Sequence, residues 1–305
     1  MTIPYFARLL CLCFAAFFLL HLALAALATA LSGHVVRRAS RMGSGAGARL
    51  LFALRLAPAS IAGAIAVGLC APSYLWFEPE PALERIGMGC VAAALASAWV
   101  CAAGIVRGAG AAARSARRLR VYEAARESAA PVLMLAGVFR PRLVVSRGVR
   151  ETLTKEQLTV ALRHERAHGE AHDNFKRLLI LLTPDALPFV RGMGAIERGW
   201  SRLAEWAADD RAVRGSRRRS LALASALVRV ARMGAAPHAP ELATHLLGSP
   251  ADLAARVERL LEGREAPALR PRVWPVVAMA VCGTVVAVQP SALALVHEAL
   301  EALAH

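Results

Sequence analysis

Cysteine is missing from the polar part of this 305-residue chain. All six cysteines lie in apolar stretches: Cys11, Cys13, Cys70, Cys90, Cys101 and Cys282. A disulfide framework and a cysteine-ligated zinc site are therefore excluded from the polar part, which fits a reducing compartment. Acidic residues are also scarce, with 22 Asp and Glu against 37 Lys and Arg, so the formal net charge is +15.

Hydrophobic residues make up 57% of the chain. Globular proteins average about 45–50%, so the excess calls for a membrane or an unusually large core. Four runs without formal charge are long enough to span a bilayer, which takes about 20 residues: 9–31, 56–77, 86–106 and 273–296. The first run has a rival interpretation as a cleaved signal peptide. It exceeds the usual apolar region of about 7–15 residues in such peptides, so we expect a retained helix.

Arginine is sorted between the segments that join these runs. Residues 32–50 carry four arginines and no acid, whereas 78–85 carry three glutamates against one arginine. The positive-inside rule then places the N-terminus and 78–85 outside, and 32–50 and 107–272 in the cytoplasm. Nucleic-acid binding is the other interpretation of so basic a chain. No recognised nucleic-acid motif accompanies the charge, so we expect no direct nucleic-acid partner.

The chain thus divides into three parts. Residues 1–106 form a membrane region with three spans, 107–272 a cytoplasmic domain, and 273–305 a fourth span with a short external tail. The predicted fold class is mainly α, with an α+β domain inserted between the third and fourth transmembrane helices.

Inside the domain, local patterns predict two strands and several helices. Thr154 and Gln157 form a capping box that starts one helix. An apolar segment, 178–190, is too short to span, so we expect a core helix or one lying against the bilayer. The remaining expected elements are strands at 132–137 and 142–146 and helices at 200–214, 219–234 and 250–263.

The capped helix carries H-E-x-x-H at His164, Glu165 and His168. Positions i and i+4 of a helix lie on one face. Both imidazoles can therefore bind one zinc ion, with Glu165 beside them to accept a proton from a water. The alternative is an ordinary polar surface helix, and further residues favour the metal.

A catalytic zinc usually takes three protein ligands, so a third must exist. His172 follows His164 by eight residues, roughly 12 Å along a straight helix, whereas a ligand atom must lie within about 2 Å of the metal. Glu205 is the better candidate, because it opens an E-x-x-x-D pattern with Asp209 on the same helix face. Glu205 can bind the zinc while Asp209 orients an imidazole N–H.

The predicted strand 142–146 lies just before the motif. Its main chain at Val144 and Val145 is the candidate site for an extended protein substrate, because strand addition supplies main-chain hydrogen bonds. In the expected reaction the zinc acidifies a water and polarises the scissile carbonyl, and Glu165 moves the proton to the leaving amine.

The run from Val132 to Val213 resembles integral-membrane zinc peptidases of the BlaR/MecR type, which are antibiotic sensor-transducers. The matching pieces are G-V-F-R-P-R-L-V-V-S at 137–146, H-E-R-A-H at 164–168 with an aspartate five residues on, and E-W-A-A-D at 205–209. The resemblance implies one zinc on His164, His168 and Glu205 and a catalytic base at Glu165. It also implies that Asp173 lies beside the ligands, in a cytoplasmic zincin-like protease domain.

The same resemblance implies that the protein lies in a bacterial inner membrane and cleaves a cytoplasmic or membrane-adjacent protein. The substrate class that the family suggests is a transcriptional repressor. Quality-control proteases of the HtpX type share both motifs and are the near alternative. A non-catalytic signalling scaffold with a structural metal site is the third alternative, although such a site has no use for Glu165.

BlaR-type sensors carry an extracellular penicillin-binding domain after the last span. This chain ends nine residues after it, so we do not expect antibiotic sensing by this chain alone. The oligomeric state stays open.

Overall fold

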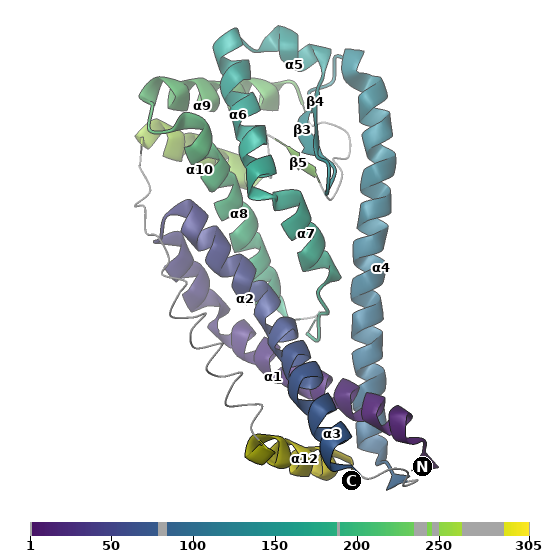
Figure 1. Ribbon diagram of the computed structural model, residues 1–305. Helices are drawn as coiled ribbons and strands as arrows, with labels where there is room; N and C mark the ends of the chain where they lie inside the picture. The colour runs from purple at the N-terminus through teal and green to yellow at the C-terminus, as the bar shows by residue number, and fades with distance from the viewer. Residues whose placement is uncertain are drawn as a thin grey trace.

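The computed structural model describes residues 2–78, 84–187, 190–234, 243–245, 250–263 and 290–304. The protein is mainly helical, and a small sheet lies at the end of the molecule far from α12 (Pro290–Ala304) (Figure 1). A two-residue strand β1 (Thr2–Ile3) pairs with β2 (Glu84–Arg85) near the N-terminus.

Three helices are long and apolar enough to cross a membrane, which supports membrane association. They are α1 (Tyr5–Ser40), the run Ser44–Phe77, and Met88–Val121 of α4 (Met88–Ala124). The second run joins α2 (Ser44–Ile65), a π-helical turn η1 (Ala66–Cys70) and α3 (Ala71–Phe77). These helices cover nearly all of the first three predicted spans. The predicted fourth span, 273–296, lies outside the described residues except for its end in α12.

The prediction that residues 32–50 form a loop is wrong. Helix α1 continues to Ser40 and α2 begins at Ser44, so only residues 41–43 connect them. Alanine and arginine are good helix formers, and they supply seven of the nineteen residues of this segment. The charge that marked the loop therefore lies on helical extensions beyond the apolar spans.

Both predicted strands are confirmed as an antiparallel pair. Strand β3 (Leu133–Ala136) pairs with β4 (Arg142–Val145), with Leu133 opposite Val145. A third strand, β5 (Ala243–His245), pairs antiparallel with the other edge of β3 and gives the order β4-β3-β5. The sequence did not predict β5, because three residues are too few to show an alternating pattern.

Six helices complete the described part of the domain. The predictions at 219–234 and 250–263 are confirmed, and the helix predicted at 200–214 is found but begins earlier, at Arg191. The apolar segment 178–190 is not one helix, because α7 (Asp173–Leu182) ends before Pro184. A residue that directly precedes a proline disfavours helical backbone. The helices are α5 (Arg147–Thr152), α6 (Lys155–Ala171), α7 (Asp173–Leu182), α8 (Arg191–Val213), α9 (Arg217–Arg232) and α10 (Pro250–Glu262).

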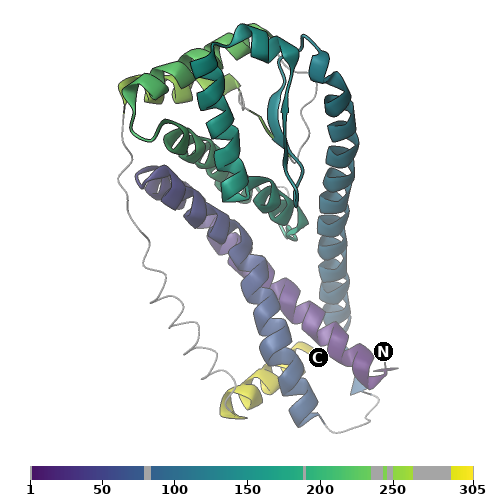
Figure 2. The same cartoon turned by 45° about the horizontal axis from the view of Figure 1, so that its top comes forward.

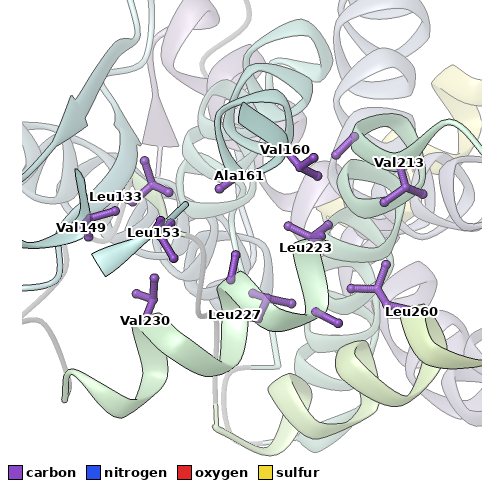
Figure 3. Packing of buried hydrophobic residues seen from close by; sticks show 13 residues of the cluster. Leu133, Val149, Leu153, Val160, Ala161, Val213, Leu223, Leu227, Val230 and Leu260 are labelled. Carbon is purple, nitrogen blue, oxygen red and sulfur yellow. The ribbon is translucent and has the colours of Figure 1, made fainter. Parts of the chain in front are cut away.

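The main core of the domain lies between α5, α6, α8, α9, α10 and β3 (Figure 3). Burial of apolar surface is the dominant favourable term in folding, so this cluster fixes α6 against its neighbours. Its labelled members are Leu133, Val149, Leu153, Val160, Ala161, Val213, Leu223, Leu227, Val230 and Leu260.

Helix α8 is anchored on the long helices α1 and α2 (Figures 1 and 2). Gly47 of α2 sits so close that a Cβ there would lie 2.8 Å from Leu203 of α8 and clash with the Ala39 carbonyl. Gly199 of α8 packs in the same way against Val36 and Leu51. One side of α8 is thus tied to α1 and α2 along much of its length, while another side meets α6.

Candidate metal centre

The H-E-x-x-H motif lies on the buried face of α6. The predicted capping box is confirmed, since Thr154 Oγ1 accepts from the Gln157 amide at 3.3 Å and Gln157 Oε1 accepts from the Thr154 amide at 3.0 Å. His164, Glu165 and His168 are at most 1% exposed. A polar surface helix is therefore excluded for this segment.

Helix α8 brings two carboxylates to the same place. Glu205 and Asp209 are both buried and both face the histidines of α6. Asp209 Oδ1 lies 2.8 Å from His164 Nδ1. The expected position of Asp209 behind an imidazole ring is thus found.

The second histidine has an equivalent partner. Asp173 Oδ2 lies 2.8 Å from His168 Nδ1. Asp173 can reach back because α6 ends at His172, whose left-handed backbone (φ +56°) lets α7 start in a new direction. Asn174 holds this break by donating to the carbonyls of Leu135 and Gly137 at 3.0 and 2.9 Å. His172 itself is exposed, as its rejection as a ligand anticipates.

The ligand atoms converge on one point. Nε2 of His164 and Nε2 of His168 are 3.1 Å apart, and the Glu205 carboxylate oxygens lie 3.5 and 3.6 Å from them. His168 Nδ1 is hydrogen-bonded to Asp173, and His164 Nδ1 lies close to Asp209. With a proton on each Nδ1, each Nε2 presents a lone pair. Lone pairs and a carboxylate that face one another at these distances repel unless a positive charge lies between them.

These residues fit a zinc ion. Imidazole nitrogens and carboxylate oxygens bind zinc at about 2.0–2.2 Å, in tetrahedral geometry, which places two ligand atoms roughly 3.3 Å apart. The three observed separations scatter closely around that value. The aspartates behind both imidazoles fix the ring orientation, as in many zinc sites.

The electrostatics of the site favour positive charge. Burial lowers the pKa of His168, but Glu205 and Asp173 outweigh it and raise the pKa to about 10. Burial likewise lowers the pKa of His164, and Asp209 reverses the direction. Burial raises the pKa of Glu205, yet His168 and Arg256 hold it well below its ordinary range. The negative potential that retains protons on these rings is the potential that a metal cation would meet.

Glu165 is suited to move a proton. It is fully buried, and within the described part of the chain neither carboxylate oxygen has a hydrogen-bond partner. Burial raises the pKa of Glu165 to about 7. A carboxylate with this pKa can accept and release a proton near neutral pH.

Val144 and Val145 do not join this cluster. Val144 is buried against Val132, Met134 and Ala136, and Val145 packs against the main core of the domain. Their side chains therefore serve the packing of the sheet. The prediction that the main chain of β4 pairs with an extended substrate does not depend on these side chains.

Arg256 of α10 is a site residue that the sequence did not single out. It is 0% exposed, and its guanidinium contacts both Asp209 and Glu205. A sequence signal existed, because Arg256 shares a helix face with Leu253 and Leu260, which pack in the core. An arginine inside an apolar stripe needs a buried acidic partner.

Comparison with protein-family models, with curated proteins and with solved structures finds no match for the chain.

Proposed function

We propose that this protein is an integral-membrane zinc endopeptidase. The observation that carries the proposal is the convergence of His164 Nε2, His168 Nε2 and the Glu205 carboxylate within 3.6 Å of one another, with Glu165 beside them. Three protein ligands leave one position of a tetrahedral zinc for water or substrate, as in catalytic sites.

Each residue then has a defined task. A zinc ion held by His164, His168 and Glu205 would supply an acidified water and polarise a carbonyl. Glu165 accepts the proton from the attacking water and returns it to the nitrogen of the leaving amine. Asp173 and Asp209 hold the Nδ1 protons of the two histidines, so that both Nε2 atoms stay aimed at the metal.

The membrane helices and the resemblance to BlaR/MecR-type peptidases narrow the proposal. The protein lies in a bacterial inner membrane with four spans, and its protease domain faces the cytoplasm, where the arginine-rich segments lie. Its substrate is a cytoplasmic or membrane-adjacent protein, with a transcriptional repressor as the class that the resemblance implies. The alternative substrate, cleaved by the same chemistry, is a misfolded membrane protein.

The experiment is a measurement of zinc content and of casein cleavage or self-cleavage for the detergent-purified chain and for Glu165→Gln. This substitution keeps the shape of the side chain and removes the base. We expect about one zinc per chain in both proteins and cleavage only with the intact chain. Zinc in both without cleavage in either favours a structural metal site, and absence of zinc from the intact chain contradicts the proposal.

A further inference from the structure

Arg256 is held rigidly beside the metal centre. Its Nε donates to Asp209 Oδ2 at 2.9 Å and its Nη2 donates to Asp209 Oδ1 at 2.7 Å. This two-pronged pairing fixes the plane of the guanidinium. Because Arg256 is 0% exposed and Asp209 is equally buried, the pair is shielded from solvent.

The remaining side of the same guanidinium faces the metal ligands. Nη1 lies 3.1 Å from Glu205 Oε2, and Nη2 lies 3.5 Å from His164 Nε2. Those two ligand atoms are themselves 3.5 Å apart. The guanidinium therefore borders the point where the ligand atoms converge.

Other basic side chains near the site are less suited to this position. Arg177 approaches Glu205 Oε1 only to 3.9 Å, is partly exposed and stacks on Trp200. Lys176 is held by Asp173, on the far side of His168. Among the described residues, Arg256 is the basic group that is both fully buried and next to ligand atoms from two elements.

We propose that Arg256 is a further catalytic residue, which stabilises the carbonyl oxygen of the scissile peptide as that oxygen takes negative charge. This inference rests on the proposed peptidase function. The oxygen of a water forms a bond to the carbonyl carbon, the π electrons of the carbonyl move to its oxygen, and Glu165 takes the water proton. The C–N bond then breaks, the oxygen returns its electron pair to form the new carboxyl, and Glu165 gives its proton to the amine nitrogen.

The physical advantage lies in preorganisation. A positive group that is already aimed at the developing charge costs no reorganisation during the reaction, and a water-excluded site strengthens its effect. Arginine suits the role because it keeps its charge at every accessible pH. Asp209 thus has two tasks, since it orients His164 and anchors Arg256.

A purely structural role for Arg256 makes different predictions. If Arg256 only steadies Asp209, and through it His164, its removal weakens zinc binding, as losses of such supporting groups do by about 10–100-fold. If Arg256 acts on the reacting oxygen, its removal leaves zinc in place and slows the chemical step.

The test compares Arg256→Gln and Arg256→Lys with a matched control, Arg259→Gln. Arg259 lies one turn further along α10 and pairs with Asp210, away from the ligands. We expect every variant to keep wild-type zinc content. For Arg256→Gln we expect kcat to fall about 10²–10³-fold, as for loss of an oxyanion donor, with KM little changed. Arg256→Lys should retain part of the rate because it keeps the charge, and Arg259→Gln should match the intact chain.

Two further measurements keep the outcome decisive. The double variant Asp209→Asn/Arg256→Gln removes both charges of the two-pronged pair together, so it serves if Arg256→Gln alone does not fold. When both proteins are loaded with zinc, it should have lower activity than Asp209→Asn. Binding of a phosphinic peptide, an anionic tetrahedral analogue, to the zinc-loaded proteins should weaken more than tenfold for Arg256→Gln and not for Arg259→Gln.

Unchanged kcat and unchanged phosphinic-peptide affinity in Arg256→Gln would overturn the inference, and so would a loss of activity that merely follows lost zinc. An intact chain that binds zinc but cleaves nothing contradicts the proposed function instead. In that case the phosphinic-peptide measurement still decides whether Arg256 recognises the tetrahedral anion.

Discussion

The described part of the chain gathers histidine and carboxylate side chains at two places. One is the centre on α6 and α8. The other lies at the opposite end of the molecule, where Glu78 meets His297 and Glu301 of α12 (Figure 1). In each place three candidate ligand atoms lie within 4.8 Å of one another. Residue types alone therefore do not separate the two clusters.

The arrangement of charge does separate them. At the α12 end, Arg8 pairs with Glu78 and donates to both oxygens of Glu301 at 2.9 and 3.0 Å, so a guanidinium already neutralises the carboxylates. At the metal centre, the carboxylates of Asp173 and Asp209 stand behind the imidazoles and turn both Nε2 atoms toward each other. Both clusters contain an arginine bound to carboxylates, Arg256 in one and Arg8 in the other. What distinguishes the candidate metal centre is its pair of imidazoles, whose Nε2 atoms face each other beside Glu205.

The largest expected difference between the two clusters comes from removing one histidine from each. His168→Ala removes one of three zinc ligands, so we expect zinc affinity to fall by well over the roughly 100-fold that loss of a supporting group causes. His297→Ala should leave zinc content unchanged. Metal analysis after dialysis against a weak chelator measures both, and equal losses in the two variants would contradict the assignment.

Removal of Arg8 should affect stability without affecting zinc. Breaking a buried ion pair costs about 3–5 kcal/mol, and the low end applies because Glu301 is partly exposed. We expect Arg8→Gln to lower the thermal unfolding temperature in detergent while the zinc content of the folded fraction stays constant. Loss of zinc from Arg8→Gln would mean that the two clusters are not independent.

The aspartates behind the imidazoles provide a finer test. Asp209→Asn and Asp173→Asn should each weaken zinc binding by about 10–100-fold, because an amide does not hold the Nδ1 proton as a carboxylate does. Asp210→Asn is the matched control, since Asp210 pairs with Ser44 and Arg259 and touches neither histidine. Competition with a zinc indicator measures all three, and an equal effect of Asp210→Asn would remove the special role of the other two.

The smallest expected effect is a pH dependence of cleavage. Burial raises the pKa of Glu165 to about 7, and the base works only when it is ionised. Activity should therefore be lost as the pH falls through that pKa, with kcat/KM about tenfold lower one unit below it. A bound cation shifts the midpoint downward, since it favours the carboxylate. A rate that rises as the pH falls would contradict the assignment of Glu165 as base.

The sequence sufficed for the parts of the site that follow local helix geometry. A capping box set the start of α6, and spacings of four residues paired His164 with His168 and Glu205 with Asp209. These features depend on neighbours along one helix, so they can be predicted without knowledge of the fold.

Features that depend on distant segments could not be predicted. Arg256 reaches Asp209 from α10, 47 positions along the chain. Its place in an apolar stripe indicates a buried acidic partner but not which residue that partner is. The turn at His172 has a left-handed backbone without glycine, and side-chain bonds from Asn174 to strand β3 hold it. The helical extensions beyond the apolar spans were missed because charge suggested a loop, whereas helix propensity and packing on α8 favoured helix.

The most direct test of the central claim is X-ray absorption spectroscopy at the zinc edge of the detergent-purified chain, recorded alongside Glu205→Gln. We predict a first shell of nitrogen and oxygen only, at about 2.0–2.1 Å, with the multiple scattering of two imidazoles. Glu205→Gln should alter the oxygen contribution and keep both imidazoles. A first shell that contains sulfur, that lacks the paired imidazoles, or that Glu205→Gln leaves unchanged would contradict the metal centre described for His164, His168 and Glu205.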